Sequence, residues 1–205
     1  MTIAIIDYAM GNVDSVQKAI NKLGYVGIIT DDHKIIEEAD FIILPGVGSF
    51  KKGMENLRKS KLIDLLTQEV IEKKKPFLGI CLGMQLVATY GTEPEKSDGL
   101  GWVDGEVVKM NDSKDLRVPH LGWNSINISR DKKKFYKDFN NQDFYFIHSY
   151  HFKASNLEEI IFTVNYGKEI VAGIQKENIY AMQFHPEKSQ KAGIALLKKI
   201  IEQYA

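Results

Sequence analysis

Residues 75–88 read KPFLGICLGMQLVA and change from an apolar strand pattern to a helical pattern within a few residues. The turn between the two patterns holds Cys81, the only cysteine of the chain, flanked by Gly79 and Gly83. A side chain at the tip of a tight strand-to-helix turn needs small neighbours, because a Cβ on either flank would collide with the reversing backbone. The stretch therefore predicts a nucleophile elbow with Cys81 at its tip. A buried structural role is commoner for a lone cysteine, and the flanking glycines argue against it here.

The segments around this elbow predict the fold class. Before it, apolar strand patterns alternate with helical ones, which indicates a parallel sheet covered by helices. The predicted strands are 3–7, 25–30 and 41–44, and the predicted helices are 13–23, 34–39 and 62–71. After residue 90 the strands become shorter and more alternating, which is typical of antiparallel hairpins at a sheet edge; they lie near 106–110, 125–128, 144–146, 160–164, 170–175 and 179–183, before a last helix at 190–204. We expect one α/β domain over residues 1–205, flavodoxin-like, with a mainly parallel central sheet, helices on both faces and antiparallel edge strands.

The composition limits the partners and the compartment. Lys plus Arg and Asp plus Glu both count 27, so no net field draws the chain to nucleic acid or to an anionic membrane. One cysteine allows neither an internal disulfide nor a four-cysteine zinc site, and the N-terminus lacks a basic segment leading into an apolar one. No apolar run approaches the roughly 20 residues that span a bilayer. We expect a soluble, cytoplasmic protein whose partners are small molecules or proteins.

A cysteine nucleophile needs a proton acceptor nearby, and histidine fills that role near neutral pH. The predicted helix N-terminus beside Cys81 also favours the thiolate. Among the five histidines His185 stands out, because it ends a strand pattern and is followed by Pro186 and Glu187. Residues two apart in extended backbone point the same way, so Glu187 can orient the imidazole. We predict a triad of Cys81, His185 and Glu187, although a strand-end histidine that only caps the sheet is the alternative.

A second glycine-rich turn, Pro45-Gly46-Val47-Gly48, lies at the carboxyl end of a predicted parallel strand, where open α/β sheets place their sites. We expect the backbone N–H groups of Val47 and Leu82 to form the oxyanion hole that acyl transfer requires. A phosphate-binding loop is the competing use of such glycines. Neither Gly-Lys-Ser/Thr nor a GxGxxG pattern is found here, which argues against it.

Taken together, these motifs resemble the class I, triad-type glutamine amidotransferases over nearly the whole chain. Further segments resemble the glutaminase subunits of imidazole glycerol phosphate synthases. They are Ile6-Asp7-Tyr8, Met10-Gly11-Asn12, Pro119-His120-Leu121-Gly122-Trp123-Asn124 and His148-Ser149-Tyr150, whereas Phe184-His185-Pro186-Glu187-Lys188-Ser189 belongs to the general class I resemblance. The resemblance implies hydrolysis of L-glutamine to glutamate and ammonia through a glutamyl thioester, without a metal or another cofactor. It also implies a substrate-binding set, which comprises Gly46, Gly48, Gln85 and the backbone of His148, Ser149 and Tyr150.

The same resemblance implies a heterodimer with a (β/α)8-barrel cyclase, which uses the ammonia to form imidazole glycerol phosphate in histidine biosynthesis. The implied contact residues are Met10, Asn12, Pro119, His120, Trp123, Asn124 and Lys188. An exposed Trp among polar residues suits an interface, with packing at a sheet edge as the plainer interpretation. Family behaviour further suggests that glutaminase activity is weak until the partner binds, with the turn at 45–48 as the gate.

Other interpretations stay open from the sequence. Paralogues that supply ammonia for sugar amidation in surface polysaccharide synthesis share the triad, and Ala9 stands where the histidine-pathway pattern more often has Gly. A cysteine peptidase or γ-glutamyl hydrolase on a similar fold should lack Gln85 and the 148–150 segment. A catalytically silent partner-binding subunit is a further alternative, and the presence of Cys81, His185 and Glu187 argues against it.

Overall fold

The computed structural model describes residues 1–111, 116–129 and 133–205. In this part of the chain nine strands form one sheet in the order β2-β1-β3-β4-β13-β12-β11-β8-β9. Five of them are parallel: β1 (Thr2–Ile6), β2 (Val26–Thr30), β3 (Phe41–Gly46), β4 (Phe77–Cys81) and β13 (Ile179–Met182). The other four are antiparallel: β12 (Lys168–Lys176), β11 (Ile160–Tyr166), β8 (His120–Ile128) and β9 (Asp143–His148). The expected mixed α/β class is confirmed.

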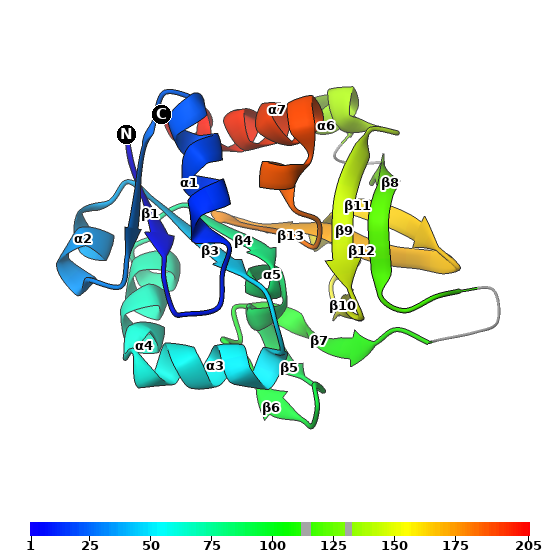
Figure 1. The fold of residues 1–205 in the computed structure, drawn as a ribbon, viewed down its shortest axis with the longest axis horizontal. Helices are drawn as coiled ribbons and strands as arrows, with labels where there is room; N and C mark the ends of the chain where they lie inside the picture. The colour runs from blue at the N-terminus through cyan, green and yellow to red at the C-terminus, as the bar shows by residue number, and fades with distance from the viewer. Residues whose placement is uncertain (112–115, 130–132) are drawn as a thin grey trace.

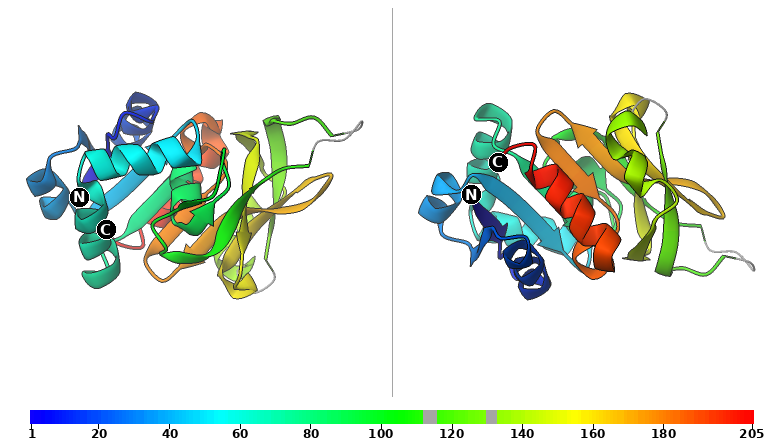
Figure 2. Two further views of the ribbon diagram at one scale, coloured as in Figure 1. Left: turned by 90° about the horizontal axis from the view of Figure 1, so that it is seen from below. Right: turned by 90° about the horizontal axis from the view of Figure 1, so that it is seen from above.

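Helices cover both faces of the sheet, as the two views in Figure 2 show. One face carries α1 (Val13–Lys22) and α7 (Gln190–Ile201), and the other carries α3 (Phe50–Lys59), α4 (Leu62–Thr67) and α5 (Leu82–Leu86). The alternation along β1 explains the two layers, because Ile3 and Ile5 pack in one buried cluster while Ala4 and Ile6 pack in the other. A strand that is buried on both sides must be apolar throughout, which is why β1 and β3 read as continuous apolar runs.

A smaller sheet of four strands, in the order β10-β7-β5-β6, lies on the α3 side of the described structure (Figure 1). Its strands are β5 (Ala88–Gly91), β6 (Ser97–Asp98), β7 (Val103–Lys109) and β10 (Tyr150–Ala154). The remaining short elements are α2 (His33–Glu38), the π-helical turn Gln68–Glu72, α6 (Lys133–Tyr136) and the 3-10 turns Lys137–Phe139, Leu157–Glu159 and Pro186–Lys188. None of the described helices is long and apolar enough to cross a membrane.

Several described elements differ from the expectations, among them β5, β6 and α6, which were not predicted. Helix α3 was not predicted, although Phe50, Met54 and Leu57 are buried at helical spacing. The helix after Cys81 ends at Leu86, because Ala88 already belongs to β5. Strand β10 was not predicted either, and it carries the carboxyl-terminal residue of the 148–150 segment into the smaller sheet.

Candidate active site

The elbow at Cys81 has the geometry that its glycines predict. Cys81 ends β4 with φ 55° and precedes α5, so the chain reverses within one residue. A Cβ on Gly79 would lie 2.7 Å from the carbonyl oxygen of Gly83, and a Cβ on Gly83 would collide with the carbonyl of Leu44 on β3. Larger residues at either glycine would therefore force the sheet and helix apart. The predicted need for small residues at both flanks is confirmed.

The histidine and its carboxylate lie just after the neighbouring strand, with Glu187 in the 3-10 turn Pro186–Lys188. Strand β13 pairs with β4 in parallel register, with Met182 opposite Ile80, so the segment after β13 emerges beside Cys81. His185 Nδ1 and Glu187 Oε1 are 2.8 Å apart and both side chains are almost wholly buried. The N–H of His185 donates to the Tyr145 carbonyl at 2.9 Å, which ties this segment to β9.

The electrostatics of His185 favour its charged form. Burial acts to lower the pKa of the imidazole, but the sulfur of Cys81 and the carboxylate of Glu187 outweigh it and raise the pKa to about 10. The His185 Nε2 atom finds no hydrogen-bond partner among the described residues, so the ring nitrogen opposite Glu187 is free to exchange a proton. These contacts bring the three predicted triad residues together as nucleophile, base and orienting carboxylate.

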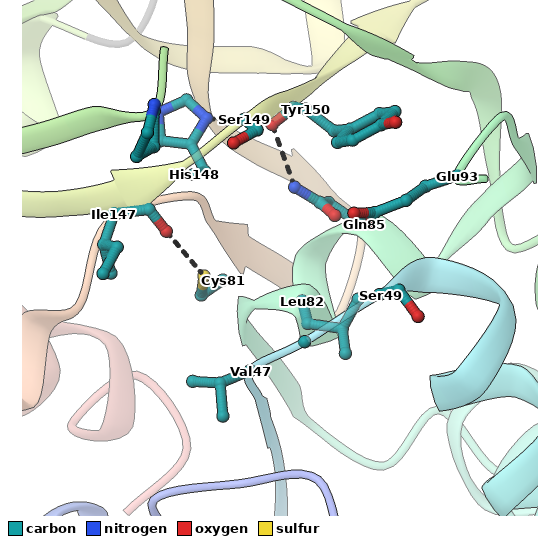
Figure 3. Close-up of a pocket in the computed structure, with 12 residues that line it drawn as sticks. Val47, Ser49, Cys81, Leu82, Gln85, Glu93, Ile147, His148, Ser149 and Tyr150 are labelled. Atoms are coloured by element: carbon teal, nitrogen blue, oxygen red, sulfur yellow. Dashed lines mark hydrogen bonds between the residues drawn. The ribbon is translucent and has the colours of Figure 1, made fainter.

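A pocket of about 410 Å³ opens above the sulfur (Figure 3). Its lining includes eight residues of the predicted site: Val47, Gly48, Cys81, Leu82, Gln85, His148, Ser149 and Tyr150. Ser49, Glu93 and Ile147 also line it, as does Pro119, which was predicted as a partner contact. Segments that are far apart in the sequence therefore meet around one cavity with the nucleophile at its base.

The side chain of Gln85 is fixed within this wall. Its Nε2 donates to the Tyr150 carbonyl at 3.0 Å, as Figure 3 shows, and to Gln183 Oε1 at 3.0 Å. Gln183 is fully buried, and its own Nε2 lies 3.8 Å from Cys81 Sγ. Gln183 was not predicted, although its position two residues before His185 in the segment that follows β13 points to the same site.

Two predicted roles in the glycine-rich turn do not hold in this structure. Gly46 pairs with Cys81 in the β3–β4 register and is buried against the Tyr8 hydroxyl and Leu82, so it does not line the pocket. The N–H of Val47 donates to the Met10 carbonyl at 2.6 Å. An N–H with that partner does not point at an oxyanion, so Val47 can act as the predicted donor only after its peptide turns.

His120 is not the surface residue that a partner contact requires. It is 2% exposed, because its ring stacks between Phe146 and Tyr166 with centroid distances of 4.6 and 4.0 Å. Its Nδ1 lies 3.0 Å from His148 Nε2, and Asn124 Nδ2 lies 3.3 Å from its Nε2. We therefore remove His120 from the predicted contact surface and place it inside the wall of the site.

The other predicted contact residues lie at or near the surface. Asn12 and Pro119 are exposed, Trp123 is 48% exposed, and Met10, Asn124 and Lys188 are half-buried. Leu121 and Ile147 face each other across β8 and β9 and are 58% and 42% exposed, and neither was predicted. For Leu121 the sequence signal is the alternation of apolar residues at 121 and 123.

Known proteins match this chain over nearly its whole length. The family model described as glutamine amidotransferase class-I matches residues 4–203. The chain is 45% identical over 199 residues to imidazole glycerol phosphate synthase subunit HisH 1 of Campylobacter jejuni (strain RM1221), covering 97% of this chain and 98% of that protein. It is 46% identical over 203 residues to imidazole glycerol phosphate synthase subunit HisH 2 of Vibrio vulnificus (strain YJ016), covering 98% and 94%. The solved structure of PurLQS from Thermotoga maritima has a similar fold, with a TM-score of 0.75 at 17% identity and coverage of 100% and 99%.

Proposed function

Since the chain belongs to the class I glutamine amidotransferases, we propose that it hydrolyses glutamine to glutamate and ammonia and supplies that ammonia for imidazole glycerol phosphate synthesis. The observation that carries the catalytic part is that Cys81 lines the pocket and lies beside the paired side chains of His185 and Glu187. The relatives are named as subunits of a synthase, which supports a partner subunit.

The reaction begins with attack of the Cys81 sulfur on the side-chain amide carbon of glutamine. The new C–S bond places a negative charge on the amide oxygen, and the Leu82 N–H at the start of α5 is free of an intrahelical acceptor and can stabilise that charge. His185 then gives its Nε2 proton to the amide nitrogen, the C–N bond breaks and ammonia leaves. Glu187 holds Nδ1 throughout and so keeps Nε2 directed at the reacting atoms.

Water completes the cycle. His185 removes a proton from a water molecule, whose oxygen attacks the glutamyl thioester, and the C–S bond breaks to release glutamate and the Cys81 thiolate. Both half-reactions use the same three side chains. The reaction therefore needs one nucleophile, one base and one orienting carboxylate.

Glutamine carries an α-ammonium and an α-carboxylate that the pocket must bind. Among the described lining residues Glu93 carries the one carboxylate, and we assign it to the ammonium group. Burial raises the pKa of Glu93, which the N–H of Phe50 partly offsets by donating to Oε2 at 3.1 Å. The Ser149 and Tyr150 carbonyls already accept hydrogen bonds within the chain. We therefore assign the backbone N–H groups of this segment and the Ser149 hydroxyl to the α-carboxylate of glutamine.

The bond between Val47 N–H and the Met10 carbonyl supports a gate on the reaction. In this arrangement one of the two predicted oxyanion donors is withheld. Met10 belongs to the loop that the sequence assigns to the partner surface, so a partner that displaces this loop would release the N–H. We therefore expect weak glutaminase activity in the isolated chain.

The partner surface is proposed to surround the pocket opening. Val47, Pro119 and Ile147 line the pocket and are also exposed, so the mouth has an apolar rim. A subunit that covers this rim would separate the pocket from bulk solvent and receive the ammonia directly. A (β/α)8-barrel cyclase is the partner that we propose.

The test is glutamate and ammonia release from glutamine, measured with and without the cyclase and its ribotide substrate. We expect strong stimulation by the cyclase, and loss of glutamine hydrolysis in Cys81→Ser with fold and cyclase binding retained, because the change is nearly isosteric. Persistent hydrolysis in Cys81→Ser would disprove the nucleophile. Hydrolysis that the cyclase leaves unchanged would instead favour a paralogue that serves sugar amidation.

A further inference from the structure

A fully buried amide, Gln183, lies between the nucleophile and the pocket wall. It follows β13, and its side chain reaches Cys81 Sγ with Nε2 at 3.8 Å and Gln85 with Oε1 at 3.0 Å. The proposed mechanism does not use this residue. A buried amide carries a desolvation cost that only well-made hydrogen bonds offset, so its two contacts need an explanation.

The orientation of this amide follows from a single backbone carbonyl. The Tyr150 carbonyl can only accept, and it accepts from both Gln85 Nε2 at 3.0 Å and His148 Nδ1 at 2.8 Å. Gln85 must therefore direct its NH₂ group toward the Tyr150 carbonyl. The same NH₂ group contacts the Gln183 amide, so the Gln183 atom in that contact must be the oxygen. The remaining atom of the Gln183 amide, which faces the sulfur, is then the NH₂ donor.

The Cys81 sulfur has a hydrogen-bond acceptor as one neighbour and a hydrogen-bond donor as another. The Ile147 carbonyl lies 3.8 Å from Cys81 Sγ and accepts from a thiol, whereas Gln183 donates toward the sulfur. Ionisation of the thiol makes the carbonyl contact unfavourable and the N–H contact more favourable. Of these two neighbours, Gln183 is the one that favours the reactive thiolate.

We propose that Gln183 is a positioning residue, which donates an N–H to the Cys81 sulfur and holds the Gln85 amide in the orientation that faces the pocket. This inference rests on the proposed role of Cys81 as nucleophile. It assigns two effects to one side chain, since the NH₂ group acts on the sulfur and the oxygen acts on Gln85. The two effects can be separated by substitution.

The first measurement is the pH dependence of Cys81 alkylation by iodoacetamide, followed by intact mass. Cys81 is the only cysteine, so the reaction has no background from other thiols. In Gln183→Met both contacts are lost, and we expect the alkylation midpoint to rise by about one pH unit, roughly a tenfold slower reaction below the midpoint. Glutamine KM should rise as well, because Gln85 keeps its bond to the Tyr150 carbonyl but loses its bond to residue 183.

Gln183→Glu separates the two effects, because it keeps an oxygen for Gln85 and replaces the donor at the sulfur. We expect the alkylation midpoint to rise while glutamine KM stays nearer to the wild-type value than in Gln183→Met. The matched control is Gln175→Met on β12, whose amide bridges the hydroxyls of Tyr136 and Tyr180 away from the pocket. This control should leave both the alkylation midpoint and KM unchanged.

Alkylation profiles of both Gln183 variants that coincide with the wild-type profile would overturn the inference. If the variants fail to fold, NMR of the wild-type chain decides the question instead. The side-chain NH₂ resonances of Gln183 should then shift when Cys81 is alkylated, and unchanged resonances would overturn it. A chain that alkylates as expected but never hydrolyses glutamine with its partner would contradict the proposed function and leave this contact intact.

Discussion

At the residue scale, the pKa of His185 depends on two neighbours, one close to it in the sequence and one far from it. Glu187 is two positions away and binds Nδ1 at 2.8 Å, while Cys81 comes from another strand. Both raise the pKa of the imidazole against the effect of burial, to about 10. A ring held in this charged form can protonate the leaving nitrogen, and the thiolate that it accompanies can attack.

Glu187→Gln tests this arrangement. The amide lacks the negative charge, so the pKa of His185 should fall, and it can present either an oxygen or an NH₂ group to Nδ1, so the tautomer is no longer fixed. We expect kcat to fall by as much as about 10,000-fold, the loss that a wrong tautomer causes in the Ser-His-Asp triad. Steady-state glutaminase kinetics measure the loss, and NMR titration of His185 measures the pKa.

The control for this change is Glu202→Gln, at the exposed end of α7, where Glu202 pairs with Lys198. It removes the same charge away from the pocket and should leave kcat unchanged. Wild-type kcat in Glu187→Gln would show that the buried carboxylate serves only packing.

At the element scale, β8, β9 and β10 are joined by a buried line of hydrogen bonds. Asn124 on β8 contacts His120, His120 contacts His148, and His148 reaches the Tyr150 carbonyl. Burial lowers the pKa of His120 to about 4 and that of His148 to about 3. Both rings are therefore neutral at physiological pH, each with one donor and one acceptor nitrogen.

This pair predicts how stability changes with pH. In the unfolded chain both rings take up protons below about pH 6.5, whereas in the folded chain they stay neutral until about pH 4 or lower. The folded state thus loses stability as pH falls from 6.5 toward 4, by roughly 2 kcal/mol per ring at pH 5. Urea unfolding at pH 5 and pH 7.5 should show a smaller difference in His120→Gln than in wild type. His33→Gln, at an exposed position on α2, should keep the wild-type difference.

The parts of the site that the sequence predicted are those that local rules fix. Cys81 between two glycines specifies its own turn. His185 and Glu187 make the predicted contact, but through the 3-10 turn Pro186–Lys188 and not through the extended backbone that the sequence predicts. The burial of His120 was not predictable, because it depends on Phe146 and Tyr166 from strands whose register only the folded sheet sets. The bond between Val47 and Met10 was likewise hidden, since it joins two loops that the sequence cannot place.

At the scale of the whole molecule, the parallel and antiparallel halves of the sheet contribute different parts of the site (Figure 1). The parallel strands β3, β4 and β13 end together and supply the turn at Val47, the nucleophile and the base. The antiparallel strands β8 and β9 form one edge of the sheet and supply the outer rim. The pocket lies where the two halves meet, so a partner docked on the edge strands would also cover the catalytic residues.

The exposed face of β8 and β9 beside the pocket mouth carries two side-chain pairs across the strands, one apolar and one aromatic. Leu121 faces Ile147, and Trp123 faces Tyr145 with ring centroids 5.9 Å apart. An aromatic anchor of this kind commonly contributes about 2 kcal/mol or more to an interface, so Trp123→Ala should weaken cyclase binding by roughly 30-fold or more. The exposed side chain contributes little to folding, and the melting temperature should change little.

Val26→Ala is the control, because Val26 is 57% exposed on β2 at the opposite edge of the sheet and should not affect binding. Titration of the cyclase against each variant measures the affinity, and equal affinity of Trp123→Ala and wild type would move the partner surface elsewhere.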